Sequence, residues 1–390
     1  MKSIELIFWL LIGLIFYSYV GYGIVLFLMV HIKRLFNKPT PPIDTVYEPE
    51  VTLLIAAYNE RDYVERKVRN SRLLNYPREK LKQVWVTDGS DDGTPDLLSV
   101  HTDVKVLHQP ERRGKIAAIT RAIKRIHTPI VVFSDANTDI SAQAIRRMVD
   151  LFRDPQTGGV AGEKRIVTHK TEDAATAGES IYWKYESTLK RWDAELNSAV
   201  GAAGELFAIR TELFQEPEAD TLLDDFMIAM RITMKGYAIK YDPEAYAIER
   251  ASANVTEELK RKVRIAAGGI QSVLRLLPLL NVFKYKLLSF QYISHRVLRW
   301  IPAPFALIAV FILNLLMVHE NSIYPILLML QISSYAMAFI GWLTERQKIR
   351  VKLAFIPYYF VMMNYAMLKG FVRYFHKTQS VNWERARRQS

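Results

Sequence analysis

A cluster of oxygen-bearing side chains follows the apolar run Ile130–Phe133. Asp135, Asn137 and Asp139 stand at alternate positions, and carboxylate and amide oxygens are the ligands that Mg²⁺ and Mn²⁺ prefer. In open α/β sheets, ligands bind beyond the carboxyl ends of the strands. The pattern therefore predicts either a metal-assisted pyrophosphate site or an Asx-rich turn that caps a helix starting near Ser141.

A second polar cluster follows the apolar run Gln83–Thr87. Asp88 ends this run and opens a turn of Gly, Asp, Ser and Thr residues. Its carboxylate can accept hydrogen bonds from a nucleobase or a ribose while the amides beyond Gly89 approach the ligand. The alternative is an ordinary turn, because such sequences are common between a strand and a helix.

Two adjacent carboxylates, Asp224 and Asp225, precede the apolar stretch Phe226–Met234. Like charges beside an apolar helix repel, so one pKa is expected to rise towards a value useful for a general base. The alternative is that one of them caps the helix. Glu205, which follows Gly204, either lines an acceptor cavity or simply begins a strand.

The cations complement these acids. Lys115 follows Gly114 at the start of a predicted helix, where a helix N-terminus and a cation together suit phosphate. Arg261 and Arg264 precede Gly268-Gly269 and either meet a diphosphate or form a basic face on anionic lipid. The sequence has neither a GxxxxGK[ST] loop nor a GxGxxG loop, which argues against a kinase, an ATPase or a dinucleotide enzyme.

Short apolar runs that alternate with amphipathic stretches must position these residues. Strands are predicted at 51–57, 83–87, 104–107, 130–133 and 237–241, and helices at 61–68, 115–126, 174–194 and 226–234. Residues 158–164 are predicted to form a glycine-rich turn into a strand, and residues 201–209 a loop that enters a strand. Strands alternating with helices indicate an α/β fold with a mainly parallel sheet and helices on both faces. Because the polar clusters all follow strands, they are expected to converge on one edge of the sheet.

The N-terminal stretch Ile4–Val30 is apolar almost throughout and exceeds the roughly 20 residues that cross a bilayer. Basic residues follow it, which places the next segment in the cytoplasm by the positive-inside rule. The net charge is +12, and much of the basic excess flanks apolar segments, which favours a lipid bilayer rather than nucleic acid as partner. The absence of cysteine excludes disulfides and Cys-ligated zinc, and the scattered histidines argue against a His-ligated zinc site.

The C-terminal third returns to membrane-like sequence. Ser272–Tyr292 mixes Leu and Phe with basic residues, as an interfacial amphipathic helix does. Val297–Val318 and Ile323–Leu343 are each long enough to span a bilayer. Ala354–Leu368 is shorter and flanked by basic residues, so it is expected to be interfacial or re-entrant, with a crossing through a thinned bilayer as the alternative.

The order and spacing of these segments resemble membrane-embedded, processive family 2 glycosyltransferases, the group that includes cellulose, hyaluronan and poly-N-acetylglucosamine synthases. The matching segments are AAYNE at 56–60, TDGSDDGT at 87–94, RRGK at 112–115, SDAN at 134–137, GAAGELFAIR at 201–210, LDD at 223–225 and RKVRIAAGG at 261–269. Each segment alone is a weak signal, but seven in the same order span the whole predicted soluble part.

The resemblance implies a GT-A domain that transfers a sugar with inversion from a nucleotide-diphosphate sugar, with a UDP-sugar as the expected donor. Asp88 would contact the base, Asp135 would stand first in a DxD motif, and Asp225 would be the general base. The residues implied to bind the nucleotide sugar are Ala57, Tyr58, Asn59, Glu60, Asp88, Gly89, Lys115, Asp135 and Arg261. Those implied to act in catalysis are Asp225, Asp224 and Arg264, and those implied to bind the acceptor are Gly204 and Glu205. The implied ligands of Mg²⁺ or Mn²⁺ are Asp135 and Asn137.

The chain departs from the family pattern at three motifs. Asn137 replaces the second Asp of DxD, which removes one negative charge from the metal site, and Asp224 replaces a Glu. In the QxxRW segment, Arg261 stands for Gln and Ile265 for Trp, while Arg264 matches the Arg that neutralises the departing diphosphate. Because that Trp helps to form the acceptor wall in processive synthases, its absence puts long-chain polymerisation in doubt.

The resulting organisation is a transmembrane helix at 1–32, a linker at 33–49, a GT-A domain at 50–270, interfacial helices at 271–295, membrane helices at 296–374 and a basic cytoplasmic tail at 375–390. We expect an integral protein of a bacterial inner membrane, with a cytoplasmic catalytic domain that extends a polysaccharide or glycan acceptor. The alternatives are transfer of one sugar to a lipid acceptor, as in ceramide glucosyltransferases, and a non-catalytic membrane scaffold that has kept the fold. The oligomeric state is left open.

Overall fold

The computed structural model describes residues 2–36, 46–167, 174–250, 255–346 and 352–378. Two compact units make up the chain: a helical unit of Met1–Met29, Thr168–Leu189 and Glu258–Gln379, and a sheet unit of Val30–Val167, Lys190–Glu257 and Ser380–Ser390. The middle of the predicted linker (37–45) and the predicted basic tail from 379 onwards lie outside the described residues.

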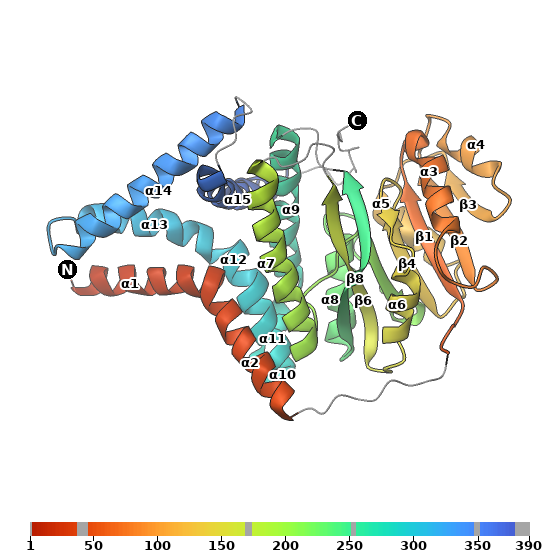
Figure 1. Ribbon diagram of the computed structural model, residues 1–390, viewed down its shortest axis with the longest axis horizontal. Helices are drawn as coiled ribbons and strands as arrows, with labels where there is room; N and C mark the ends of the chain where they lie inside the picture. The colour runs from red at the N-terminus through yellow and green to blue at the C-terminus, as the bar shows by residue number, and fades with distance from the viewer. Residues whose placement is uncertain (1, 37–45, 168–173, 251–254, 347–351, 379–390) are drawn as a thin grey trace. The chain divides into compact units, whose positions relative to one another are not determined.

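The described part of the sheet unit contains one eight-stranded mixed sheet in the order β3-β2-β1-β4-β7-β6-β8-β5 (Figure 1). Its strands are β1 (Val51–Ala57), β2 (Leu81–Asp88), β3 (Val104–Gln109), β4 (Ile130–Asp135), β5 (Asp139–Ile140), β6 (Thr157–Val167), β7 (Leu206–Arg210) and β8 (Ala238–Arg250). Its helices are α3 (Arg61–Arg72), α4 (Thr94–Ser99), α5 (Lys115–Ile123), α6 (Ala144–Leu151), the 3₁₀ turn η2 (Thr211–Leu213) and α8 (Asp224–Met234).

The strands β3, β2, β1 and β4 are neighbours and run parallel to one another, which confirms the predicted βαβ half. β7 pairs antiparallel with β4 and with β6, and β8 pairs parallel with β6. All seven residues of β1 are buried, as expected for a central strand that is covered on both faces. The predicted α/β class is therefore confirmed, with antiparallel pairs in the second half of the sheet.

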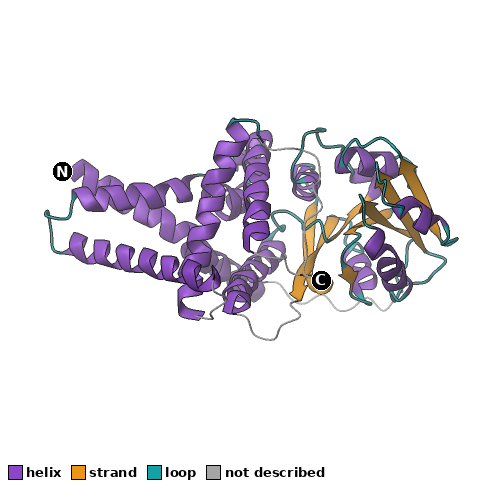
Figure 2. Ribbon diagram, turned by 90° about the horizontal axis from the view of Figure 1, so that it is seen from above, coloured by secondary structure: helices purple, strands orange, loops and turns teal. Residues whose placement is uncertain are grey.

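Helices cover both faces of this sheet, because alternate strand residues point to opposite sides. Leu53 and Ile55 of β1 pack on one face in a cluster with residues of α3, α4 and α6. Leu54 and Ala56 pack on the other face with residues of α5 and α8. Figure 2 shows the strands gathered between these two layers of helices.

The other helices of the described residues belong to the helical unit or join it to the sheet unit. These are α1 (Lys2–Phe16), η1 (Tyr17–Gly21), α2 (Tyr22–Phe36), α7 (Ala174–Leu196), α9 (Val255–Arg275), η3 (Leu277–Leu280), α10 (Val282–Tyr285), α11 (Leu287–Tyr292), η4 (Ile293–Val297), α12 (Leu298–Trp300), α13 (Pro302–Leu316), α14 (Ile323–Arg346) and α15 (Lys352–Phe375). The 21-residue helix α9 includes the predicted basic stretch with Arg261 and Arg264.

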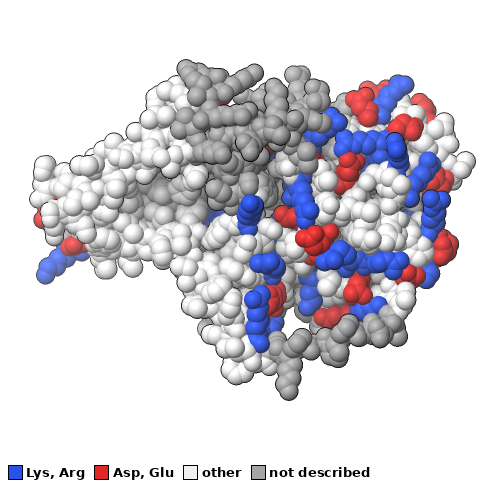
Figure 3. Space-filling view, viewed as in Figure 1, with Lys and Arg blue, Asp and Glu red and all other residues white. Residues whose placement is uncertain are grey.

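Among the described residues, two helical stretches are long and apolar enough to cross a membrane, Lys2–Phe36 and Ile323–Glu345. A third candidate is the pair Leu287–Trp300 and Pro302–Leu316, which is bent by 51° at its break. Charged side chains gather over the sheet unit, whereas the visible face over α1 and α13 is almost free of them (Figure 3). The predicted segment 354–368 lies within α15, whose Pro357 stands inside the helix.

Candidate active site

Three adjacent parallel strands end in the polar clusters that the sequence singled out. In the register of the sheet, Ala56 of β1 is paired with Asp135 of β4, and Ala57 with Thr87 of β2. On the other side of β4, Ser134 is paired with Leu206, the first residue of β7. The loop that contains Gly204 and Glu205 therefore reaches the same edge, as the parallel topology and the antiparallel insertion of β7 require.

Asp88 holds the loop that precedes α5. Its side chain is buried, and Oδ2 accepts hydrogen bonds from the backbone N–H groups of Arg113, at 2.9 Å, and Gly114, at 2.6 Å. Its Oδ1 is buried without a hydrogen-bond partner in the described structure and lies 3.9 Å from the guanidinium of Arg121. An unsatisfied buried acceptor is costly unless a ligand donates to it, so this oxygen is a candidate position for binding a ligand.

The loops after β1, β2 and β3 pack against one another. Gly89 has φ +69°, and a Cβ atom there would lie 2.9 Å from the backbone of Arg112. The guanidinium of Arg112 lies 3.7 Å from the ring centroid of Tyr58. The side chain of Asn59 donates to Asp91 and accepts from its backbone N–H. The close approach at Gly89 leaves no room for a side chain.

Ala57 and Glu60, at the end of β1 and in the loop after it, are both buried, and their contact with a nucleotide sugar stays a prediction. Ala57 is the last residue of β1 and belongs to the hydrophobic core. Glu60 is also buried, and its backbone N–H donates to Oγ1 of Thr94. These contacts tie the first loop to the start of α4.

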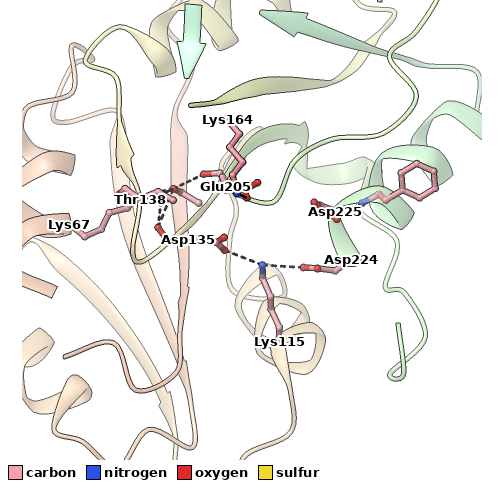
Figure 4. A network of polar contacts seen from close by, with 10 residues as sticks. Lys67, Lys115, Asp135, Thr138, Lys164, Glu205, Asp224 and Asp225 are labelled. Atoms are coloured by element: carbon pink, nitrogen blue, oxygen red, sulfur yellow. Dashed lines mark hydrogen bonds and ion pairs between the residues drawn. The ribbon is translucent and has the colours of Figure 1, made fainter. Parts of the chain in front are cut away.

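Lys115 links two of the predicted acidic clusters (Figure 4). Its Nζ lies 3.1 Å from Oδ1 of Asp135 and 3.7 Å from Oδ2 of Asp224. These three residues line one small pocket whose other lining residues are Leu54, Ala56, Ile119, Phe133, Ser134, Gly204 and Phe207. Burial lowers the pKa of Lys115, but Asp135, Asp224 and Asp225 outweigh that effect and raise it above its ordinary value. The pocket therefore holds a permanent ammonium between carboxylates.

Asp225 combines burial with a second negative charge. Burial and the adjacent Asp224 raise its pKa to about 7, while Lys115 opposes the rise. Its Oδ1 accepts a hydrogen bond from the backbone N–H of Phe226 at 2.7 Å. A Cβ atom at Gly204 would lie 3.2 Å from Oδ2 of Asp225, so the glycine lets the backbone approach this carboxylate. A carboxylate with a pKa near 7 is suited to accept a proton at neutral pH.

Asn137 lies two residues beyond Asp135, half-buried in the turn between β4 and β5. Asp139 begins β5 and is paired with Arg66. Among the described residues, no group of three or more His, Cys, Asp or Glu side chains surrounds a common point where a metal ion would fit. A metal at this turn would accordingly need oxygen ligands from a bound molecule in addition to Asp135 and Asn137.

The side chain of Glu205 is engaged in a buried ion pair. Lys164 contacts the carboxylates of both Glu205 and Glu249, and all three side chains are buried. The backbone carbonyl of Glu205 accepts a hydrogen bond from Ser134 Oγ at 3.1 Å. This contact links Glu205 to β4 beside Asp135, and its predicted contact with an acceptor stays a prediction.

Arg261 and Arg264 lie on α9, in the helical unit, whereas the other predicted site residues lie in the sheet unit. Arg261 is 3.7 Å from Glu258 one turn earlier, and Arg264 is half-buried. Their roles towards a diphosphate stay predictions.

Two lysines of this network, Lys67 and Lys164, were not among the predicted site residues. Lys67 falls within the helix predicted at 61–68, yet its side chain is only 1% exposed. The signal was present in the sequence, because Val64, Lys67, Val68 and Ser71 have the i, i+3, i+4, i+7 spacing of one helix face and all four are buried. Lys164 carried no comparable signal, since an isolated lysine in a strand is normally exposed.

The sequence of residues 52–216 matches the family described as "Glycosyl transferase family 2". The chain is 28% identical over 251 residues to a poly-β-1,6-N-acetyl-D-glucosamine synthase of Staphylococcus aureus, covering 61% of this chain and 58% of that protein. It is 26% identical over 237 residues to the corresponding synthase of Staphylococcus epidermidis, covering 58% and 56%. The matched region thus spans less than two thirds of these relatives.

Among solved structures, the fold is similar to that of a mannosyltransferase from Pyrobaculum calidifontis in complex with GDP-Man and Mn²⁺. The TM-score is 0.72 at 23% identity, and the alignment covers 96% of this chain and 100% of that one. This likeness shows the fold and agrees with the mixed sheet described above. Residues 52–216 therefore carry the sequence pattern of a family 2 glycosyltransferase domain, and the fold is that of a GT-A-like mannosyltransferase.

Proposed function

We propose that this enzyme transfers a sugar, with inversion, from a nucleotide-diphosphate sugar to a glycan acceptor at the cytoplasmic face of a membrane. The observation that carries the proposal is the position of Asp225. This carboxylate is buried, its pKa is raised to about 7, and its neighbour Asp224 shares a pocket with Lys115 and Asp135. Such a site can deprotonate an acceptor hydroxyl beside a bound diphosphate.

The nucleotide is proposed to bind across the ends of β1 and β2. Oδ1 of Asp88, which has no hydrogen-bond partner in the described structure, can accept an N–H donor from the base, and Tyr58 presents an aromatic ring in the adjacent loop. An imide N–H, as in uracil, supplies such a donor, and so does guanine. We expect a UDP-sugar, with a GDP-sugar as the alternative, because the mannosyltransferase of similar fold was solved with GDP-Man.

The donor diphosphate is proposed to lie against Lys115 and the turn at Asp135. The oxygens of Asp135 and Asn137 fit Mg²⁺ or Mn²⁺ when the diphosphate supplies further ligands, which is how proteins commonly bind these ions. The carboxylate of Asp135 lines the pocket, and Mn²⁺ accompanies the nucleotide sugar in the mannosyltransferase of similar fold. When bound, the ion would offset negative charge on the departing diphosphate.

In the proposed reaction, the acceptor oxygen forms a bond to the anomeric carbon as the bond from that carbon to the diphosphate oxygen breaks. The acceptor proton passes to Asp225, and the nucleoside diphosphate leaves with both electrons of the broken bond. Lys115 contributes a positive charge at the diphosphate, because its raised pKa keeps it protonated. Arg264, with Arg261, is proposed to neutralise the leaving group, as the resemblance to family 2 synthases implies.

The raised pKa of Asp225 predicts a pH dependence. Below its pKa of about 7 the carboxyl is neutral and cannot accept a proton, so kcat/KM should fall about tenfold for each pH unit below 7 and level off above it. Initial rates of nucleotide release between pH 5.5 and 9 would measure this profile. A rate that is independent of pH between 5.5 and 7 would exclude Asp225 as the base.

Two acceptor classes remain, and a specific observation favours each. The similarity to poly-β-1,6-N-acetyl-D-glucosamine synthases supports extension of a polysaccharide. Ile265, at the position where the family pattern has Trp, supports transfer of one sugar to a lipid acceptor. Gel or thin-layer separation of products from a labelled donor should show a ladder for the first and a single species for the second. We expect the ladder, and a single species would establish the lipid alternative.

The helices support the proposed localisation. Lys2–Phe36 and Ile323–Glu345 are long and apolar enough to span a bilayer, and the basic residues Lys33 and Arg34 stand in the last turn of the first of them. By the positive-inside rule, the catalytic domain is proposed to face the cytoplasm of a bacterial inner membrane. The lipid bilayer is thus a proposed partner.

A further inference from the structure

The side chain of Lys67, on α3, contacts the turn that carries Asp135 and Asn137. Its Nζ donates to Ser134 Oγ at 2.7 Å, to the backbone carbonyl of Thr138 at 2.8 Å and to Thr138 Oγ1 at 3.1 Å. Ser134 and Thr138 flank the turn on either side. A protonated lysine has three N–H donors, so all of them are used on one turn. Figure 4 shows Lys67 and Thr138 on the side of Asp135 away from Asp225.

Burying the charged side chain of Lys67 costs folding free energy, which a side chain with a packing role alone would avoid. Lys67 is 1% exposed, and its three hydrogen-bond partners are neutral oxygens rather than carboxylates. Asp139, one residue beyond the turn, is paired with Arg66 instead. A methionine of similar length would fill the same volume without the desolvation of a charge. The hydrogen bonds to the turn are therefore what the lysine adds.

The same helix holds the rest of the segment. Asn70, one turn after Lys67, accepts a hydrogen bond from the backbone N–H of Ile140 at 2.8 Å and donates to its carbonyl at 2.9 Å. Arg66 pairs with Asp139 through its Nε and one terminal guanidinium nitrogen, Nη2. Three side chains of α3 thus fix residues 134–140 at successive points. Because α3 begins directly after the loop at Tyr58, it connects this turn to the proposed base-binding loop.

We propose that Lys67 is a positioning residue that holds the Asp135–Asn137 turn in the geometry needed to bind a divalent cation together with the donor diphosphate. This inference rests on the proposed function. It explains how a turn with one carboxylate and one amide can serve as a metal site: its backbone is fixed before the ligand arrives, so less ordering is needed on binding. Lys67 does not touch the substrate, and its effect passes through Asp135 and Asn137.

The test compares Lys67→Met with two matched controls on the same helix. Val68→Ala removes buried apolar volume beside Lys67, and Arg72→Met removes an exposed ion pair with Asp103. Binding of Mn²⁺ to the full-length protein in detergent would be measured by electron paramagnetic resonance, in the presence of UDP and, separately, GDP. Calorimetry without metal would measure binding of the same nucleotides. Lys67→Gln, which keeps N–H donors without the charge, serves if the methionine variant does not fold.

We expect Lys67→Met to weaken Mn²⁺ binding at least tenfold with less than a threefold change in metal-free nucleotide affinity. Val68→Ala should lower the melting temperature without changing Mn²⁺ binding, and Arg72→Met should change neither. Mn²⁺ binding by Lys67→Met equal to that of Val68→Ala would overturn the inference while leaving the proposed function intact. A wild-type protein that binds nucleotide but no Mn²⁺ would overturn the metal part of the proposed function and the inference with it.

Discussion

Replacing Asp225 by Asn should reduce sugar transfer by about a thousandfold, within the range that a general base contributes to catalysis. The amide has nearly the same shape as the carboxylate but cannot accept the acceptor proton. Its oxygen can still accept the hydrogen bond from Phe226, so the first turn of α8 should be preserved. Initial rates with a labelled donor would measure the loss.

The matched control for this variant is Asp220→Asn, which neutralises an exposed acid a few residues before α8. It should keep the wild-type rate. Nucleotide affinity should stay within a few-fold of wild type in both variants, because Asp88 and Lys115 are unchanged. If Asp225→Asn folds normally and retains more than a tenth of the wild-type rate, another group must take the proton.

Asp135→Asn should lower transfer by at least about a hundredfold, because a well-placed electrostatic group at a diphosphate supplies several kcal/mol to the transition state. The change removes the carboxylate that lies 3.1 Å from Lys115 and replaces the proposed charged metal ligand by a neutral one. The half-saturating Mn²⁺ concentration should rise together with the loss of rate. A titration of activity against Mn²⁺ and Mg²⁺ measures both effects.

Asp103→Asn is the control for this second variant, since Asp103 is exposed and paired with Arg72 on the surface of the sheet unit. Its activity and its metal requirement should match those of the wild type. An Asp135→Asn enzyme with a normal metal requirement would remove Asp135 from the metal site, whatever its rate.

The parallel half of the sheet was predictable because its strands are buried on both faces. The run Val51–Ala57 is apolar at every position, and a run of that kind can only be a buried strand or a buried helix. The polar clusters at Asp88 and Asp135 then mark the strand ends. Their meeting at one edge follows from parallel topology alone.

The antiparallel half was less accessible to sequence reasoning. The short strand β7 lies between β4 and β6, and no local pattern in its five residues specifies that pairing. The strand β8 continues to Arg250, well beyond the predicted end near Tyr241, because its later residues pair with β6 and β5. The position of β7 in the sheet and the length of β8 depend on pairing between residues that are distant in sequence. The periodicity of apolar residues could not predict them, because it indicates only which face of an element is buried.

In the candidate site, too, some features follow from local sequence patterns and others depend on contacts between residues that are distant in sequence. The elements that carry Asp88, Lys115 and Asp225 follow from the pattern, since each residue stands at the end of a strand or the beginning of a helix. The direction of the Glu205 side chain does not, because it depends on Lys164, which lies 41 residues away in sequence. The buried Lys67 breaks the usual rule that lysine is exposed, and such exceptions are often found where a fold supports a functional site.

The most direct test of the central claim is nucleotide release by the wild-type and Asp225→Asn proteins, in membranes, across UDP-, GDP- and dTDP-sugars. One nucleotide class should be released by the wild type at a rate that depends on the divalent cation and on acceptor. The Asp225→Asn protein should bind the same donor but release nucleotide about a thousandfold more slowly. Equal release by the two proteins, or release from no donor in this series, would contradict a transfer reaction with Asp225 as its base.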